Sequence, residues 1–131
     1  METARQLSIF LENKPGTLAE VCEELARKKV NIYALSISDT VDHSVVRMVV
    51  SDWQTAAHVL GDRGVLVVEN TVLLIENANK AGTLAAISRK LAKAKGNIEH
   101  AYLATSPTSK KGLAVIRVSD TKKALKLLAD L

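Results

Sequence analysis

The chain has 131 residues and a net charge of +4, and 47% of its residues are hydrophobic but only 3% are aromatic. A core of aliphatic side chains argues against nucleic-acid binding by base stacking on aromatic rings. The charge is uneven, since residues 1–69 carry 7 basic and 10 acidic side chains, whereas residues 70–131 carry 11 and 4. The basic second half leaves open a contact with an acidic partner.

The first half has the pattern of a βαββαβ unit. Apolar and polar residues alternate over 6–12, as in a strand with one buried face. The turn Asn13–Gly16 leads into a helix, at whose start Thr17 and Glu20 are spaced for a reciprocal side-chain cap. We then expect strands over 31–38 and 45–50, a helix from 53 to about 60 that Asp52 caps, and a fourth strand over 65–68.

The second half repeats the first, because the segment Asn13–Leu18 returns 66 residues later as Asn79–Leu84. We expect a strand over 72–75, then a helix that Gly96 ends with a positive φ, whereas Val30 at the equivalent position requires a different ending. Strands over 98–104 and 113–118 and a final helix capped by Asp120 follow. The repeat predicts two domains, residues 1–69 and 70–131.

No fourth strand is predicted in the second unit. The edge of its first strand would therefore be unpaired, and proteins usually cover such an edge. We expect the cover to be another chain, the Met1–Arg5 arm, or the nearly continuous Val65–Ile75 segment.

The repeated loop has the chemistry of a zwitterion site. A glycine turn that leads directly into a helix leaves the N–H groups of Gly16, Thr17 and Leu18 pointing outward at the positive end of the helix dipole, where a carboxylate or phosphate binds. The Asn13 amide adds an oxygen for an ammonium group. Asn, Pro and Gly are also ordinary turn formers before a helix, so a purely structural role stays open.

The residues Glu12–Ala19, Asn31-Ile32 and Ser36–Thr40 together resemble the ACT domain, a small βαββαβ regulatory module that binds amino acids. The whole chain is similar to stand-alone tandem ACT proteins, although Ala81 stands where the family usually has proline. The resemblance implies an α+β fold of two ferredoxin-like units with antiparallel sheets and helices on one face. Paired units usually form one eight-stranded sheet, which would have seven strands here.

In that family the effector lies at the interface between two ACT units, held by the loop of one unit and the second strand, or its neighbour, of the other. The resemblance implies a homodimer and an amino-acid ligand. The ligand-binding residues that it implies are Asn13, Pro15, Gly16, Thr17, Leu18 and Asn31 from the first copy, and Asn79, Gly82, Thr83, Leu84 and Asn97 from the second.

The sequence shows no candidate catalytic group. His43, His58 and His100 are scattered, Cys22 is alone, and no nucleophile or phosphate-loop motif is present. We therefore predict a protein that is not an enzyme, with no metal and no cofactor. Because no segment resembles a signal peptide or reaches membrane-spanning length, we expect a cytoplasmic protein without a membrane partner.

Two functions from different classes remain. The first is a sensor in which a small amino acid binds between ACT units and a target enzyme or regulator responds to their arrangement. The second is an interaction module without a ligand, in which the basic second half docks an acidic partner. Nucleic acid is the less favoured of such partners, because the chain has few aromatic residues.

Overall fold

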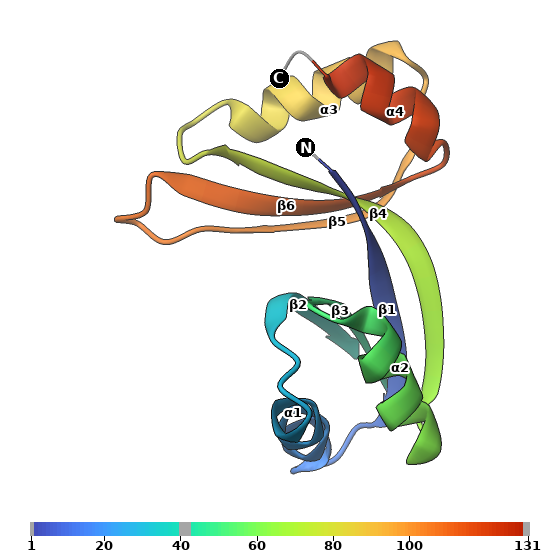
Figure 1. Cartoon of the computed structure of the whole chain (residues 1–131). Coiled ribbons are helices and arrows are strands. Elements are labelled where there is room, and N and C mark those ends of the chain that lie inside the picture. The colour runs from blue at the N-terminus through green and yellow to red at the C-terminus, as the bar shows by residue number, and fades with distance from the viewer. Residues whose placement is uncertain (1, 40–42, 130–131) are drawn as a thin grey trace. The chain divides into compact units, whose positions relative to one another are not determined.

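The computed structural model describes residues 2–39 and 43–129. The elements alternate as the repeat predicts (Figure 1). In chain order they are β1 (Glu2–Glu12), α1 (Thr17–Arg27), β2 (Ile32–Asp39), β3 (His43–Val50), α2 (Trp53–Asp62), β4 (Leu66–Ala78), α3 (Thr83–Lys93), β5 (Ile98–Ala104), β6 (Lys111–Val118) and α4 (Thr121–Leu128).

The strands of the described residues form one six-stranded sheet in the order β2-β3-β1-β4-β6-β5. Strand β3 is antiparallel to β1 and β2, and β6 is antiparallel to β4 and β5. The expected count of seven is wrong, because the strands predicted at 65–68 and 72–75 are parts of the single strand β4. Its polar centre, Glu69-Asn70-Thr71, remains extended instead of turning.

The chain divides into two compact units within this strand order. One is Arg5–Asn70, and the other runs from Thr71 onward and includes the residues up to Ala4. The first unit has the strand order β2-β3-β1-β4, and the second has β5-β6-β4 followed by the start of β1. The start of β1 therefore takes the place of the missing fourth strand. Of the three covers expected for this edge, the structure confirms the N-terminal arm, over its described residues.

Each unit has its own aliphatic core between its helices and one face of its strands. The first is centred on Leu7, Ile9, Leu25, Met48 and Leu60, all fully buried. The second contains the equivalent set Leu73, Ile75, Leu91, Ile116 and Leu128. Burial of each such side chain contributes roughly 1.5–3 kcal/mol, so both units are held mainly by this layer.

The helix starts differ from the prediction at α1. The N-cap is Gly16, with φ 89°, so Thr17 is already the first helical residue. The Thr17 hydroxyl donates to the Lys14 carbonyl at 3.1 Å instead of capping, and no side chain caps α1 in the described structure. The predicted Thr17–Glu20 cap is therefore wrong, because the left-handed turn at Gly16 places the N-cap one residue earlier in the chain than predicted.

The caps predicted at α2 and α4 are confirmed. The Asp52 carboxylate accepts from the Thr55 N–H at 3.2 Å, and the Asp120 carboxylate accepts from the Lys123 N–H at 3.1 Å. A hydrogen bond from the Thr55 hydroxyl, followed by those from the backbone N–H groups, lowers the pKa of Asp52 from its usual value of 3.8.

The ends of α1 and α3 also differ from the prediction. The left-handed residue is not Gly96 but the preceding Lys95, with φ 58°, and Lys29 has the same φ in the first unit. Val30 N–H then donates to Leu25 O at 2.9 Å, and Gly96 N–H donates to Leu91 O at 3.0 Å. Both helices thus end in the same six-residue closure, with the positive φ at the lysine that precedes Val30 in one unit and Gly96 in the other.

Candidate functional site

The two repeated loops have nearly the same backbone. Gly16 and Gly82 have φ values of 89° and 93° and act as the N-caps of α1 and α3. A glycine cap has no side chain with which to satisfy the first N–H groups of a helix. The Thr17 and Thr83 N–H groups donate to Lys14 O and Lys80 O at 3.4 Å, whereas those of Leu18 and Leu84 have no acceptor among the described residues and lie at the positive end of the dipole. Both loops thus begin a helix without a side-chain cap, and the binding of an anionic group there stays a prediction.

The side chains of the first loop are open to solvent. Asn13 is exposed, and its amide has no hydrogen-bond partner among the described residues. Lys14 Nζ forms an ion pair with Glu12 Oε2 at 3.2 Å. Pro15 is also exposed, whereas Leu18 packs against the first core. Leu18 can contribute to a ligand site through its backbone N–H.

The equivalent residues of the second loop make different contacts. The Asn79 amide donates to the carbonyls of Ser106 and Ser109 at 2.9 and 2.7 Å, so it holds the loop between β5 and β6. The Thr83 hydroxyl donates to Ala78 O at 2.9 Å. Leu84 is 45% exposed, in contrast to its half-buried counterpart in the first unit. The Asn79 amide is therefore already engaged within the protein.

Asn31 and Asn97 lie at the other end of their units. The Asn31 N–H donates to Ser51 Oγ at 2.9 Å, and the Asn97 N–H donates to Ser119 Oγ at 3.3 Å. In the first unit the glycine loop follows the end of β1, where Glu12 pairs with His43, whereas β2 starts at the opposite end of β3. The eight residues of β3 separate these ends by roughly 20 Å, so one unit does not bring its loop and Asn31 together.

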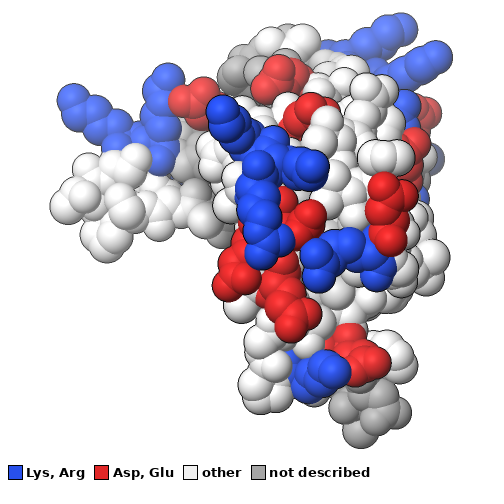
Figure 2. Space-filling view, turned by 60° about the horizontal axis from the view of Figure 1, so that its bottom comes forward, with Lys and Arg blue, Asp and Glu red and all other residues white. Residues whose placement is uncertain are grey.

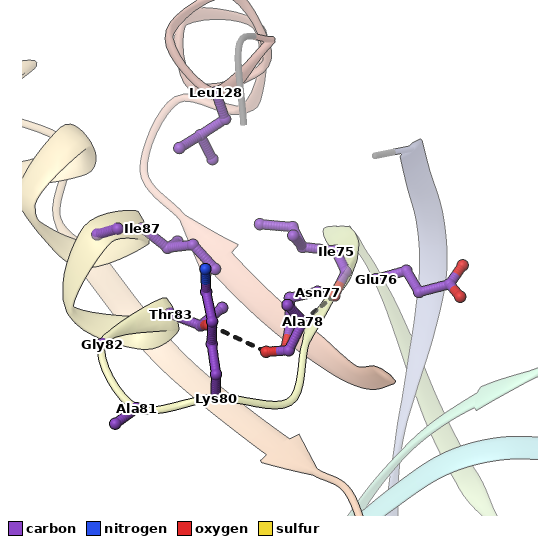
Figure 3. Close-up of a pocket in the computed structure, with 11 residues that line it drawn as sticks. Ile75, Glu76, Asn77, Ala78, Lys80, Ala81, Gly82, Thr83, Ile87 and Leu128 are labelled. Atoms are coloured by element: carbon purple, nitrogen blue, oxygen red, sulfur yellow. Dashed lines mark hydrogen bonds between the residues drawn. The ribbon is translucent and has the colours of Figure 1, made fainter. Parts of the chain in front are cut away.

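A pocket of about 530 Å³ lies beside the second loop, between β4, α3 and α4, and we call it the β4–α3 pocket (Figure 3). Lys80, Gly82 and Thr83 line it from the loop and the helix start. Its other walls include Ile75, Asn77, Ala86, Ile87 and Leu128. Among its lining residues, Gly82 and Thr83 are the ones predicted from the sequence as ligand-binding residues. Comparison of the two copies could have revealed it, because Asn77 occupies the position of Leu11.

The charged side chains on the helices of the second unit are all basic. Neither α3 nor α4 contains a carboxylate, and together they hold the basic helix layer of Arg89, Lys90, Lys93, Lys122, Lys123 and Lys126. In the first unit Arg27 and Arg63 both pair with Glu24. Figure 2 shows this kind of mixture on one face of the molecule, where blue and red side chains lie next to each other over much of the surface.

The side chains that could bind a metal ion do not gather in one place among the described residues. Within residues 2–39 and 43–129 there is no group of three or more His, Cys, Asp or Glu side chains that could hold a metal ion. Cys22 is half-buried on α1, without a disulfide. No helix in the described part of the chain is both long enough and apolar enough to span a membrane.

The fold and the loops define a class of protein, namely paired ferredoxin-like units whose first strands lead through a glycine turn into an open helix start. The chain belongs to a known family of this class, because the model of the ACT domain pair matches residues 2–130. The resemblance seen in the sequence is therefore confirmed. Members of this class resemble regulatory domains rather than catalytic ones.

Solved structures agree with this assignment. A crystal structure of a protein from Bacteroides thetaiotaomicron is 36% identical, covers 98% of this chain and 88% of its own, and has a TM-score of 0.90. The regulatory subunits of aspartate kinase from Thermus thermophilus and Thermus flavus are 18% and 19% identical, with TM-scores of 0.71 and 0.65. Both alignments cover 99% of this chain, and 97% and 96% of theirs. A search of curated proteins gave no match.

Proposed function

We propose that this chain is a non-catalytic regulatory protein that binds a small amino acid at the interface between ACT units. The observation that carries the proposal is that both loops place a left-handed glycine at the start of a helix without a side-chain cap. Backbone N–H groups beside the positive end of a helix dipole favour a carboxylate, which every amino acid has.

The proposed contacts divide by copy. Asn13, Pro15, Gly16, Thr17 and Leu18 form the first loop site, where the Asn13 amide, which has no partner among the described residues, is available to the ligand. Gly82, Thr83 and Leu84 form the second, with Asn79 holding the loop in place. Asn31 and Asn97 lie away from the loops of their own units, so any ligand contact from them requires a loop of a different unit.

Binding becomes regulation only if the ligand favours one arrangement of the units. A ligand with equal affinity for two arrangements shifts neither population, however tightly it binds. We propose that the protein is a cytoplasmic homodimer and that a target enzyme or regulator responds to its ligand-bound arrangement. The two aspartate kinase subunits among the similar structures make an enzyme the first target to test.

The test is a thermal-shift screen of the purified chain against the twenty amino acids at low and moderate salt. A ligand that binds only the folded state raises the melting temperature, by an amount that grows with its concentration. We expect a rise with one amino acid or a few related ones at both salt concentrations. If none produces a shift at millimolar concentration, the proposal fails.

The basic helix layer favours a second candidate function, docking of an acidic partner without a ligand. α3 and α4 carry only basic charged side chains, so the charge along both helices is positive. A contact driven by such charges weakens steeply with ionic strength, whereas a zwitterion in a pocket is less sensitive. A partner that is retained at low salt and released at moderate salt, with no shift from any amino acid, would favour this function.

A further inference from the structure

The β4–α3 pocket lies where the two units differ at one cross-strand pair. In the first unit Leu11 lies opposite Ser44, and Leu11 is only 6% exposed. The equivalent pair in the second unit is Asn77 and Gly112. An apolar side chain that belongs to the first core is thus replaced by an amide, and its neighbour has lost its side chain altogether. The second unit therefore has a polar side chain, Asn77, where the first unit has an apolar one.

Gly112 is required by this packing. A Cβ added at Gly112 would lie 3.0 Å from Ala104 O and 3.1 Å from Thr105 Cβ, which is too close for an ordinary side chain. Asn77 is held beside it, because its Nδ2 donates to Ile75 O at 2.9 Å. The Asn77 Oδ1 receives no hydrogen bond from the described residues, and it therefore remains an acceptor at the wall of the pocket.

The second difference between the units is the pairing of the loop lysine. Lys14 is paired with Glu12, but the position of Glu12 is occupied in the second unit by Ala78. Lys80 consequently has no carboxylate partner among the described residues, and it lines the pocket. Its side chain runs from the loop toward Ile87 (Figure 3).

Glu76, the carboxylate on β4 that precedes Lys80, does not neutralise Lys80. Glu76 also lines the pocket, but its side chain points away from Lys80 in Figure 3. It forms an ion pair with Lys111 at 3.4 Å instead. The pocket therefore combines an ammonium that no described carboxylate pairs with, an amide oxygen and the Thr83 hydroxyl with an apolar wall of Ile75, Ile87 and Leu128.

We propose that the β4–α3 pocket binds an α-amino acid with a branched aliphatic side chain. The ligand carboxylate pairs with Lys80, its ammonium donates to Asn77 Oδ1, and its side chain packs against Ile87 and Leu128. A second charge on the ligand would face the apolar wall without a partner, at a large desolvation cost, so charged amino acids are excluded. The volume of about 530 Å³ lies in the range of small-molecule pockets.

This inference rests on the proposed function, since it names the ligand class and the contacts of the second glycine loop. It places this ligand within the second unit, because all the residues that line the pocket belong to that unit. It adds a ligand cation, Lys80, and an apolar subsite that the loop sequence does not contain. It also assigns the carboxylate to a side chain in this copy, whereas in the first copy Lys14 is occupied by Glu12.

The test is isothermal titration calorimetry of the full chain with L-leucine, L-isoleucine, L-valine, L-aspartate and L-lysine. We expect heat of binding with the three branched amino acids and none with the charged pair. Lys80→Met removes the charge but keeps most of the stem, and it should weaken binding about tenfold or more, because a charge-assisted hydrogen bond is lost. Lys14→Met is the matched control and should leave the affinity unchanged.

Two further measurements separate the contacts. Ala86 lines the pocket from the exposed surface of α3, so Ala86→Phe should fill the pocket and abolish binding of the branched amino acids at this pocket, while the circular dichroism and melting temperature stay close to those of the wild type. The acid 4-methylpentanoate has the side chain and carboxylate of leucine without the ammonium, and it should bind more weakly than leucine. Equal binding would overturn the role of Asn77.

The outcomes distinguish the inference from the proposed function. If an amino acid binds but prefers neither a branched side chain nor Lys80, or if Ala86→Phe binds as the wild type does, the inference fails and the proposed function stands. If no amino acid gives heat or a thermal shift, both fail.

Discussion

The left-handed glycine at the start of α1 allows a stability prediction from the backbone alone. Gly16 has φ 89°, and a Cβ added there would meet no atom within 4 Å. Gly16→Ala therefore introduces no clash with a neighbour, and its whole cost is the strain of an L-residue in the left-handed region. That strain is about 1–2 kcal/mol. We expect the free energy of unfolding of the first unit to fall by about 1 kcal/mol or somewhat more, since alanine also restricts the unfolded chain.

Gly61 provides the matched control in the same unit. A Cβ at Gly61 would also meet nothing within 4 Å, but Gly61 lies in α2 and is not among the glycines with positive φ. Gly61→Ala should therefore stabilise the unit by roughly 0.5–1 kcal/mol, because alanine loses less backbone entropy on folding. The same chemical change in equally open surroundings thus has opposite signs, and the two variants should differ by about 2 kcal/mol.

The assay is urea unfolding followed by tryptophan fluorescence. The chain has one tryptophan, Trp53, which packs against the first core and so reports on the unit that contains both glycines. Midpoint and slope are compared together, because a changed slope would indicate a changed denatured state rather than changed stability. If Gly16→Ala is as stable as the wild type, or if both variants shift the midpoint in one direction, the strain argument is refuted.

Three further predictions concern the cores, a cap and the loops. Leu60→Ala should cost more than Leu128→Ala within the usual range of about 2–5 kcal/mol, because the space left by Leu128 joins an existing pocket; equal losses on urea unfolding would contradict this. Asp52 has a lowered pKa in the folded state, so its contribution to stability is complete above pH 3.8 and is lost as the pH falls through the folded pKa. The difference in melting temperature between the wild type and Asp52→Asn should therefore shrink over that acid range, and a constant difference would argue against this contribution. Asn13→Ala should weaken amino-acid binding with little change in stability, whereas Asn79→Ala should lower the stability of the second unit, because two carbonyls of the β5–β6 loop lose their donor. Calorimetry would measure binding and urea unfolding would measure stability, and a loss of stability in Asn13→Ala with none in Asn79→Ala would contradict the prediction.

The fold was largely predictable because the sequence states it twice. A single βαββαβ pattern is weak evidence, but two copies at a constant offset locate the helices and most strands independently of each other. The caps at Asp52 and Asp120 were predictable for a local reason. Each carboxylate bonds to an N–H three residues ahead, so the interaction depends on only a few neighbouring residues.

The helix ends were harder to predict, although they too are local. Thr17 matches a capping pattern, yet the φ of 89° at Gly16 makes glycine the cap. At Lys95 the left-handed conformation falls one residue before the glycine that seemed suited to it. Residue preference ranks such alternatives by about 1 kcal/mol at most, and one or two hydrogen bonds of the helix closure are enough to reverse that order.

The sequence alone determined that two aliphatic units with glycine loops follow each other, since periodicity, cap residues and the repeat are properties of the chain itself. Only the tertiary structure decided that β4 is continuous through its polar centre and that the start of β1 completes the second unit. The same holds for the divergence of the loops, in which Asn79 binds the β5–β6 loop and Lys80 lines a pocket. The physical reason is that strand pairing and side-chain partners depend on residues far apart in the chain, and identical letters acquire different roles when their distant neighbours differ.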